Sequence, residues 1–231
     1  MAKRLFVTGA GTDVGKTYVS ALIVKKMRDC GFNCGYFKPA LSGAELRGGK
    51  LFLGDMEYVK KISGLDMDDT SVSFAYKSAV SPHLAARLEN NFFNMDKVKS
   101  DFQKLSDKFE YIVIVGAGGI VCPFKYEKDE IIMTEDIIKE LKAPAVLAAL
   151  CGLGSINSSL LSISYIKSAG IALKAVIFNN FKGGVMEEDN IKTVSEIGGI
   201  LPALTVNSGA RELETDAETL SNLFGEVSYD V

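Results

Sequence analysis

The chain has no tryptophan, one histidine, five prolines and four cysteines in 231 residues. The cysteines (Cys30, Cys34, Cys122 and Cys151) lack Cys-x-x-Cys spacing, which argues against a disulfide or zinc framework and favours a reduced cytoplasmic protein. We expect them to be small core residues. No run approaches the roughly 18 apolar residues of a membrane span, and the N-terminal apolar run is too short for a signal-peptide core of roughly 7–15 residues. The sequence therefore predicts a cytoplasmic protein without a membrane partner.

A strong charge of either sign is also missing. The net charge is −3, and acidic and basic residues are interspersed, so there is no electrostatic reason to expect a nucleic acid or an anionic membrane as partner. An apolar content of 47% is enough to bury a substantial core. Because α/β chains of this length commonly form one unit, we expect a single domain over residues 1–231.

Apolar runs with the character of strands alternate with segments of helical periodicity. The predicted strands are 4–8, 34–38, 111–115, 145–150 and 173–178. The predicted helices are 16–29, 82–89, 95–107, 134–142, 155–168 and 187–197. This alternation predicts an α/β fold of three layers, with a mostly parallel central sheet and helices on both faces. The glycine-rich polar stretch 42–54 is expected to be a loop on the ligand face.

The stretch GAGTDVGKT (9–17) lies between a predicted strand and a predicted helix, the context of a phosphate-binding loop. Its glycines let backbone N–H groups converge on phosphate oxygens, and the positive end of the following helix adds to them. Lys16 can reach the β and γ phosphates, and the Thr17 hydroxyl can bind magnesium. The alternative is an ordinary strand-to-helix turn that contains Gly-Lys-Thr, but strand, loop and helix together favour a P-loop NTPase-like domain.

The loop is one residue longer than the usual spacing and resembles the dethiobiotin synthetase pattern G-T-x-T-x-V-G-K-T. Ala10 replaces the first Thr of that pattern, and the later residues match: Thr12, Val14, Gly15, Lys16 and Thr17. Deviant loops of partition ATPases carry an extra early lysine, which residues 9–14 lack. The resemblance implies that Thr12 and Lys16 act in catalysis and that ATP lies against Asp13, Val14, Gly15, Lys16, Thr17 and Tyr18.

KPALSG (38–43) follows the second predicted strand, where ligands bind in parallel sheets. By itself it fits a solvated lysine and a proline that ends a strand. It resembles the K-P-x-x-S-G motif of dethiobiotin synthetases, which implies that Lys38 is catalytic and that Ser42 contacts substrate. Asp55 opens a probable helix and suits the helix dipole there. By the resemblance Asp55 contacts ATP and, with Thr17, binds Mg²⁺.

Two further stretches resemble segments of that family. SPHLAARLE (81–89) holds the only histidine, His83, which by position is a capping or structural residue rather than a catalyst. GLGSINSSLLS (152–162) fits a glycine-rich turn with serine and asparagine caps, and equally a carboxylate site at a helix start. The resemblance implies that this turn completes the substrate site of a homodimer through Gly154, Ser155, Ile156 and Asn157.

The stretch YIVIVGAGGI (111–120) predicts a buried strand that ends in a glycine loop. Val115 stands where the family motif E-G-A-G-G supplies a magnesium carboxylate. The resemblance places Val115, Gly116, Ala117 and Gly118 beside ATP with one metal ligand missing. It places the adenine base against Asn179 and Asn180 and, more weakly, against Pro202, Ala203 and Leu204. Without the resemblance, an asparagine at a strand end commonly forms hydrogen bonds with the backbone of the following turn.

The resemblance implies that 7,8-diaminopelargonic acid, carbon dioxide (as bicarbonate) and ATP become dethiobiotin, ADP and phosphate, through a carbamate and a carbamic-phosphoric anhydride. Two alternatives stay open. One is a P-loop regulatory or partition-type ATPase that acts as a nucleotide-switched binding module. The other is an ATP-binding homologue whose catalysis is impaired because Val115 replaces the glutamate.

Overall fold

A computed structural model describes residues 2–200 and 203–229. Within them, parallel strands form a central seven-stranded sheet in the order β11-β10-β9-β1-β6-β2-β5. These strands are β1 (Lys3–Gly9), β2 (Cys34–Leu41), β5 (Thr70–Ala75), β6 (Tyr111–Val115), β9 (Ala145–Leu150), β10 (Leu173–Phe181) and β11 (Ala203–Asn207). The predicted α/β class and parallel sheet are confirmed, and the direction of the strands brings all their carboxyl ends to one edge.

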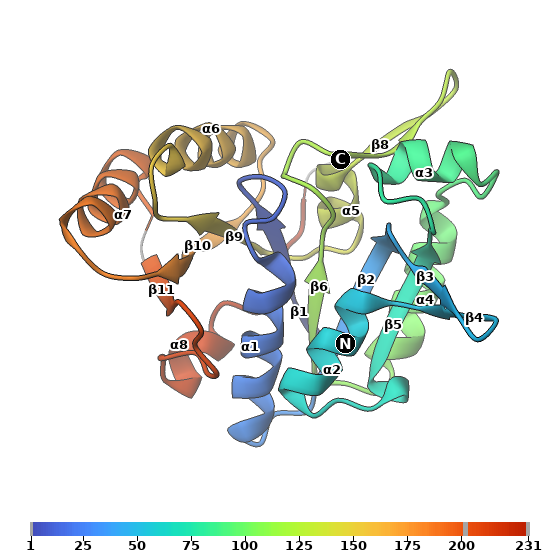
Figure 1. Cartoon of the computed structure of the whole chain (residues 1–231), viewed down its shortest axis with the longest axis horizontal. Coiled ribbons are helices and arrows are strands. Elements are labelled where there is room, and N and C mark those ends of the chain that lie inside the picture. Colours follow the sequence, from blue (N-terminus) through green and yellow to red (C-terminus); the bar gives the residue numbers. More distant parts are fainter. Residues whose placement is uncertain (1, 201–202, 230–231) are drawn as a thin grey trace.

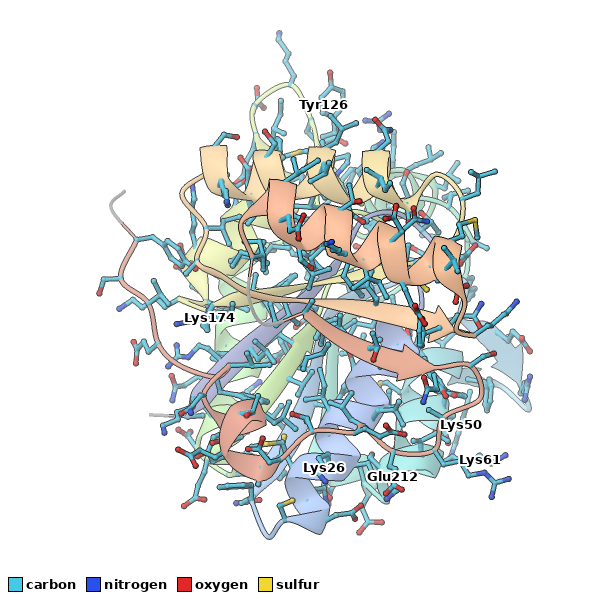
Figure 2. All side chains as sticks on the ribbon, turned by 90° about the vertical axis from the view of Figure 1, so that its left-hand side faces the viewer. Lys26, Lys50, Lys61, Tyr126, Lys174 and Glu212 are labelled. Carbon is cyan, nitrogen blue, oxygen red and sulfur yellow. The ribbon has the colours of Figure 1, made fainter. Side chains whose placement is uncertain are left out.

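Helices cover both faces of this sheet (Figure 1). One face packs against α1 (Lys16–Asp29), α2 (Gly54–Ser63) and α8 (Ala217–Ser221). The other packs against α3 (Pro82–Leu88), α4 (Met95–Ser106), α5 (Thr134–Glu140), α6 (Ser155–Ser168) and α7 (Val185–Gly198). A 3₁₀ helix covers Met67–Asp69. The turned view of Figure 2 brings α6 and α7 to the front, side by side.

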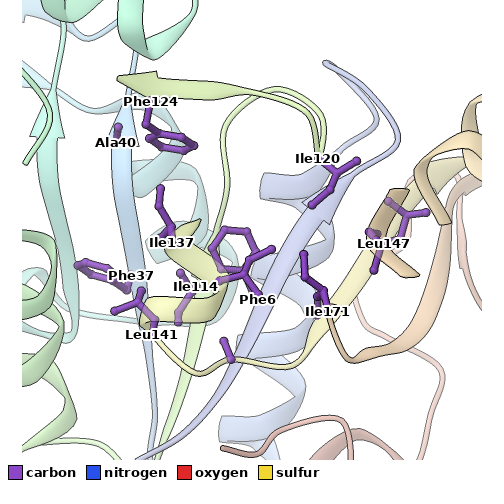
Figure 3. Close-up of a cluster of buried hydrophobic side chains, with 14 of the residues drawn as sticks. Phe6, Phe37, Ala40, Ile114, Ile120, Phe124, Ile137, Leu141, Leu147 and Ile171 are labelled. Atoms are coloured by element: carbon purple, nitrogen blue, oxygen red, sulfur yellow. The ribbon is translucent and has the colours of Figure 1, made fainter. Parts of the chain in front are cut away.

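Strand β6 shows why the central strands are apolar throughout. Its alternate residues enter two separate clusters, Ile112 and Ile114 on one face, and Val113 and Val115 on the other. Figure 3 shows Ile114 beside Phe6 and near Ile137 of α5. Burial of each such side chain contributes roughly 1.5–3 kcal/mol, so the two apolar faces hold the middle of the sheet between its helix layers.

Several features of the fold differ from the sequence predictions. The expected loop 42–54 contains a hairpin of β3 (Glu45–Arg47) and β4 (Lys50–Phe52), whose side chains are largely exposed and therefore carry no core pattern. A second hairpin joins β7 (Pro123–Tyr126) and β8 (Ile131–Met133). Strand β5 was not predicted, because its sequence TSVSFA has only three apolar residues.

Strand β2 continues past Lys38 through Pro39 to Leu41, so the predicted end of this strand at residue 38 is wrong. The proline interrupts no ladder with β6, because β2 pairs with β6 only as far as Phe37. The catalytic candidate Lys38 therefore stands on a strand, where its backbone is fixed by pairing with Val72 of β5.

The described residues contain no helix that is both long and apolar enough to cross a membrane. That residues 1–231 form a single domain stays a prediction.

Candidate functional site

A cleft of about 1190 Å³ opens at the carboxyl ends of β1, β2 and β6. The phosphate loop, the middle of β2, the start of α2 and the glycine loop after β6 each contribute part of its wall. Candidate residues from the sequence that line it are Thr12, Asp13, Gly15, Lys16, Thr17, Tyr18, Lys38, Ser42, Asp55, Gly116, Ala117 and Gly118. Segments that are far apart in the chain thus meet at the edge where a parallel sheet binds ligands.

The phosphate loop has a backbone that only small residues allow at two points. Gly9 is crowded, since a Cβ atom there would lie 2.9 Å from the Gly11 oxygen and from Val14 Cγ2. Gly15 has φ of 88° and precedes α1, so it turns the chain into the helix. The exposed Asp13 also has a positive φ, 57°. The loop is therefore folded tightly over the start of α1, and the free N–H groups of that helix face the cleft.

Lys16 begins α1 and is only 9% exposed. Its Nζ donates to the carbonyl of Gly11 at 2.9 Å, which bends the side chain back over the loop. Burial, followed by the nearby positive charge of Lys38, lowers the pKa of Lys16 from 10.5 to about 8. Because burial disfavours the charged form of Lys16, a bound anion would stabilise that form.

Lys38 is the second buried cation of the cleft, with 5% of its surface exposed. Its ammonium group forms an ion pair with the carboxylate of Asp55, at the start of α2. That carboxylate is 39% exposed, so one of the two partners stays accessible from the cleft. The structure thus brings together the two residues that the sequence assigns to catalysis and to metal binding.

The glycine loop after β6 packs directly on the phosphate loop. The N–H of Ile120 donates to the carbonyl of Gly9 at 3.0 Å, and the N–H of Gly116 donates to that of Val7 at 3.1 Å. A Cβ atom on Gly116 would lie 3.0 Å from the Phe6 ring. Val115 is fully buried among apolar side chains and does not line the cleft, although it immediately precedes Gly116, which does. Its side chain offers no ligand atom to a metal.

Asn179, the predicted reader of the base, lies at the end of β10 and is 8% exposed. Its Nδ2 donates to the carbonyl of Val14 at 3.1 Å, and a Cβ atom on Gly15 would lie 2.0 Å from the same nitrogen. The Asn179 side chain therefore packs against the phosphate loop at Val14 and Gly15. Its Oδ1 is buried without a hydrogen-bond partner in the described part of the chain.

Neither Asn179 nor the other base candidates among the described residues line the cleft. Asn180 is exposed and has a left-handed backbone, with φ of 61°. Ala203 and Leu204 begin β11, pack against the two hydrophobic clusters and do not line the cleft. Pro202 falls outside the described residues. The segment after β11 comes nearer, because the Tyr18 hydroxyl donates to the carbonyl of Ala210.

The turn between β9 and α6 contains the remaining candidates. Gly154 has φ of 85° and precedes the helix, and the Ser155 N–H donates to the carbonyl of Gly152 at 3.1 Å. The Ser155 hydroxyl is buried and unpaired within the described residues, and Ile156 is half-buried. Asn157 is exposed. None of them lines the cleft of their own chain.

Several residues of the cleft were not singled out from the sequence, among them Tyr58 and Cys122. Tyr58 stands one turn after Asp55 on α2, and its ring lies 6.3 Å from that of Tyr18, centroid to centroid. Burial raises the pKa of the Cys122 thiol. The only available signal was the position of each residue just beyond a recognised motif. His83 lies near the hairpin residue Tyr126, ring centroids 6.1 Å apart, and does not line the cleft.

Comparison with protein families gives a match to the family described as "AAA domain" over residues 3–211. The chain is 43% identical over 229 residues to the ATP-dependent dethiobiotin synthetase BioD of Clostridium botulinum strain Langeland, covering 98% of this chain and 100% of that protein. It is 44% identical, with the same coverage, to the protein of that name from strain 657. The protein of that name from strain Eklund 17B is 41% identical, covering 97% and 99%.

Solved structures with the same fold include a MinC:MinD cell division complex of Aquifex aeolicus, with a TM-score of 0.55 and 12% identity, covering 97% of this chain and 87% of that one. A ParA family ATPase of Chlorobium tepidum gives a TM-score of 0.53 at 12% identity, covering 95% and 88%. These likenesses concern the arrangement of the sheet and helices alone.

Replacing Gly15 with alanine tests the contact between the phosphate loop and β10. The new Cβ would lie 2.0 Å from Asn179 Nδ2, at a left-handed φ of 88°. We expect Gly15→Ala to lower the free energy of unfolding by about 2–4 kcal/mol, measured by urea denaturation without ligand. Gly11→Ala is the matched control, since its Cβ would meet only Val14 Cγ1 at 3.9 Å. Equal losses for the two variants would contradict the contact.

Proposed function

Because the chain belongs to the family of ATP-dependent dethiobiotin synthetases, we propose that it converts 7,8-diaminopelargonic acid, carbon dioxide and ATP to dethiobiotin, ADP and phosphate. The supporting observation is the cleft that gathers Lys16, Lys38 and Asp55 beside a phosphate loop. Two buried ammonium groups suit a reaction that moves a phosphoryl group. A cytoplasmic location stays a prediction.

The proposed reaction has three steps. One amine of the substrate attacks carbon dioxide and loses a proton, which gives a carbamate. A carbamate oxygen then attacks the γ-phosphorus as the bond to ADP breaks, and a carbamic-phosphoric anhydride results. Finally the second amine attacks the carbonyl carbon, phosphate leaves, and loss of a proton completes the cyclic urea. None of these steps needs a covalent link to the protein.

In this proposal the protein contributes position and charge. Lys16, on the phosphate loop, stabilises the charge that develops between the β and γ phosphates, with the Thr12 segment beside it. Lys38 stands beside the carbamate and is oriented by its ion pair with Asp55. Because both lysines are largely removed from water, their charges act more strongly on the transition state than they would in solution.

Magnesium fits the donors that the cleft presents. The Thr17 hydroxyl and the Asp55 carboxylate both line it, and oxygen atoms are the ligands that Mg²⁺ prefers. We propose that these two residues hold Mg²⁺ together with the phosphates and water. The ion would supply neutralising charge for the triphosphate. Val115 has no ligand atom, so of the two positions that the resemblance assigns to metal carboxylates only Asp55 offers one.

The nucleotide base is proposed to lie against Asn179. Its Oδ1 is a buried acceptor without a partner in the described residues, which suits the exocyclic amine of adenine. Its Nδ2 already donates to Val14, so the side chain is held in one orientation. The Tyr18–Ala210 hydrogen bond brings the segment after β11 against the start of α1.

The substrate is proposed to contact Ser42 in the cleft and, through its carboxylate, Gly154, Ser155, Ile156 and Asn157 of a second copy of the chain. Ser42 Oγ is buried and unpaired within the described residues. The turn before α6 lies outside the cleft of its own chain, which supports a site completed in a homodimer. Leu153 in this turn is exposed to 95%, and Leu161 in the middle of α6 is exposed to 64%.

The test of the function is formation of dethiobiotin by the native chain supplied with diaminopelargonate, bicarbonate, Mg²⁺ and ATP. We expect one phosphate released per ring closed, and no dethiobiotin when any component is left out. ATP hydrolysis that does not depend on the diamine would favour a nucleotide-switched binding module instead. The same assay carried out with Val115→Glu and Val115→Gln separates a missing ligand from a change of packing.

We expect Val115→Glu to lower the Mg²⁺ concentration needed for half-maximal rate by about tenfold, because it restores a second carboxylate. Val115→Gln introduces a side chain of nearly the same shape as glutamate but without its charge, so it should leave the Mg²⁺ concentration for half-maximal rate as it is in the native chain. An inactive native chain beside an active glutamate variant would identify an impaired homologue. Identical Mg²⁺ dependence in all three proteins would sink the idea that a ligand is missing.

The lowered pKa of Lys16 predicts a pH dependence of ATP binding. Without ligand this lysine loses its proton around pH 8 rather than around 10.5, and ATP binds the charged form. Affinity should therefore be nearly constant below pH 7 and fall about tenfold between pH 7 and pH 9, measured by titration calorimetry. In Lys16→Arg the cation stays charged, so any remaining affinity should not fall over this range. A native affinity independent of pH would contradict the shift.

The homodimer is tested by light scattering with Leu153→Asp and Leu161→Asp. A charge on a surface that is covered in the dimer should give monomers, and the KM for diaminopelargonate should rise at least tenfold while ATP still binds. Leu46→Asp on the β3–β4 hairpin is the control, since that leucine is also exposed, to 61%. A native chain that is monomeric and active would overturn the shared site.

A further inference from the structure

Asn190 of α7 is a buried amide outside the cleft, with 8% of its surface exposed. Its Nδ2 donates two hydrogen bonds, to the carbonyl of Cys151 at 2.9 Å and to that of Gly152 at 3.1 Å. Both carbonyls belong to the turn from β9 to α6. An asparagine whose amide nitrogen donates two hydrogen bonds to one turn fixes the position of the backbone of that turn.

The turn that Asn190 holds leads directly into the proposed carboxylate site. The carbonyl of Gly152 also accepts the N–H of Ser155, so this oxygen joins α7 to the first residue of α6. Gly154 takes a left-handed conformation between them, with φ of 85°. Glycines on both sides of the exposed Leu153 allow the backbone of this turn many conformations. The external amide therefore sets where the N–H groups at the start of α6 point.

The same turn is tied to the phosphate loop through β10. The Cys151 thiol lies 3.8 Å from the carbonyl of Asn179, whose side chain donates to Val14 of the loop. Burial raises the pKa of the Cys151 thiol, so it keeps its proton and can donate. At the other end, α7 is held to the end of β10 by the Lys182 N–H, which donates to Glu187 at 2.7 Å. The turn thus has fixed neighbours on both sides.

We propose that Asn190 is a positioning residue for substrate binding: it holds the β9–α6 turn so that the start of α6 can receive the substrate carboxylate. This inference rests on the proposed function, in which the start of α6 binds that carboxylate. Asn190 does not touch substrate itself. Its loss should therefore weaken binding of the diamino acid. The phosphate loop is contacted by Asn179 rather than by Asn190, and the contact between Cys151 and the Asn179 carbonyl does not involve the Asn190 amide, so the affinity for ATP should be kept.

The experiment measures kcat and both KM values for Asn190→Asp, which has the same size but no amide hydrogens. We expect the KM for diaminopelargonate to rise about tenfold, with kcat and the KM for ATP within about twofold of native, as for the loss of one or two buried hydrogen bonds. Asn190→Ser, which can reach at most one carbonyl, should give a smaller rise. Asn190→Gln keeps the amide and should recover part of the native KM.

Ser195→Ala is the matched control, because among residues 2–200 and 203–229 the Ser195 hydroxyl bonds only to Ile191 of its own helix. It should leave all three constants unchanged. Native KM values in the folded aspartate and serine variants would overturn the inference, and so would equal changes in both KM values. Failure of both variants to fold would show that Asn190 is needed for the fold alone. If the native chain makes no dethiobiotin, the proposed function is refuted. The results with the Asn190 variants do not bear on that question.

Discussion

The burial of two like charges at the carboxyl edge of the sheet is the constraint on which the site depends. Lys16 and Lys38 are both largely removed from water, and each has one oxygen partner, the Gly11 carbonyl and the Asp55 carboxylate. Asp55 already neutralises Lys38, whereas burial and the nearby charge of Lys38 disfavour the charged form of Lys16, which a bound anion would stabilise. The surrounding sheet, with its apolar clusters on both faces, supplies the stability that lets the cleft keep these charges in place.

The sequence predicted the fold well where apolar periodicity was strong. The helix 16–29 and the strand 111–115 were predicted with the bounds that the structure has, because a phosphate loop and a glycine loop mark their ends. Strand β5, with three apolar residues, and the two hairpins, whose strands are only three or four residues long, were missed. At the site, the motifs identified residues that line the cleft. They did not predict that Asn179 holds the Val14 carbonyl or that Asn190 holds the turn before α6, since such contacts between distant segments leave no local pattern.

The fold alone does not identify the chemistry of this chain. A MinC:MinD cell division protein complex and a ParA family ATPase share the arrangement of its sheet and helices at 12% identity. The chemistry of this chain lies at its strand ends, where residues 9–14 have no lysine and β2 places Lys38 in the cleft, against Asp55. A parallel sheet of this kind is a frame whose function is decided by a few side chains at one edge.

The hydrogen bond from Asn179 to Val14 joins two segments that are 165 positions apart in the chain. The phosphate loop is made first during synthesis, but the side chain that supports it arrives only with β10, next to last among the strands of the sheet. A nascent chain that has built β1 and α1 alone therefore has the motif without its support. The phosphate loop therefore gains this support only when β10 has joined the sheet, late in the order in which the chain is made.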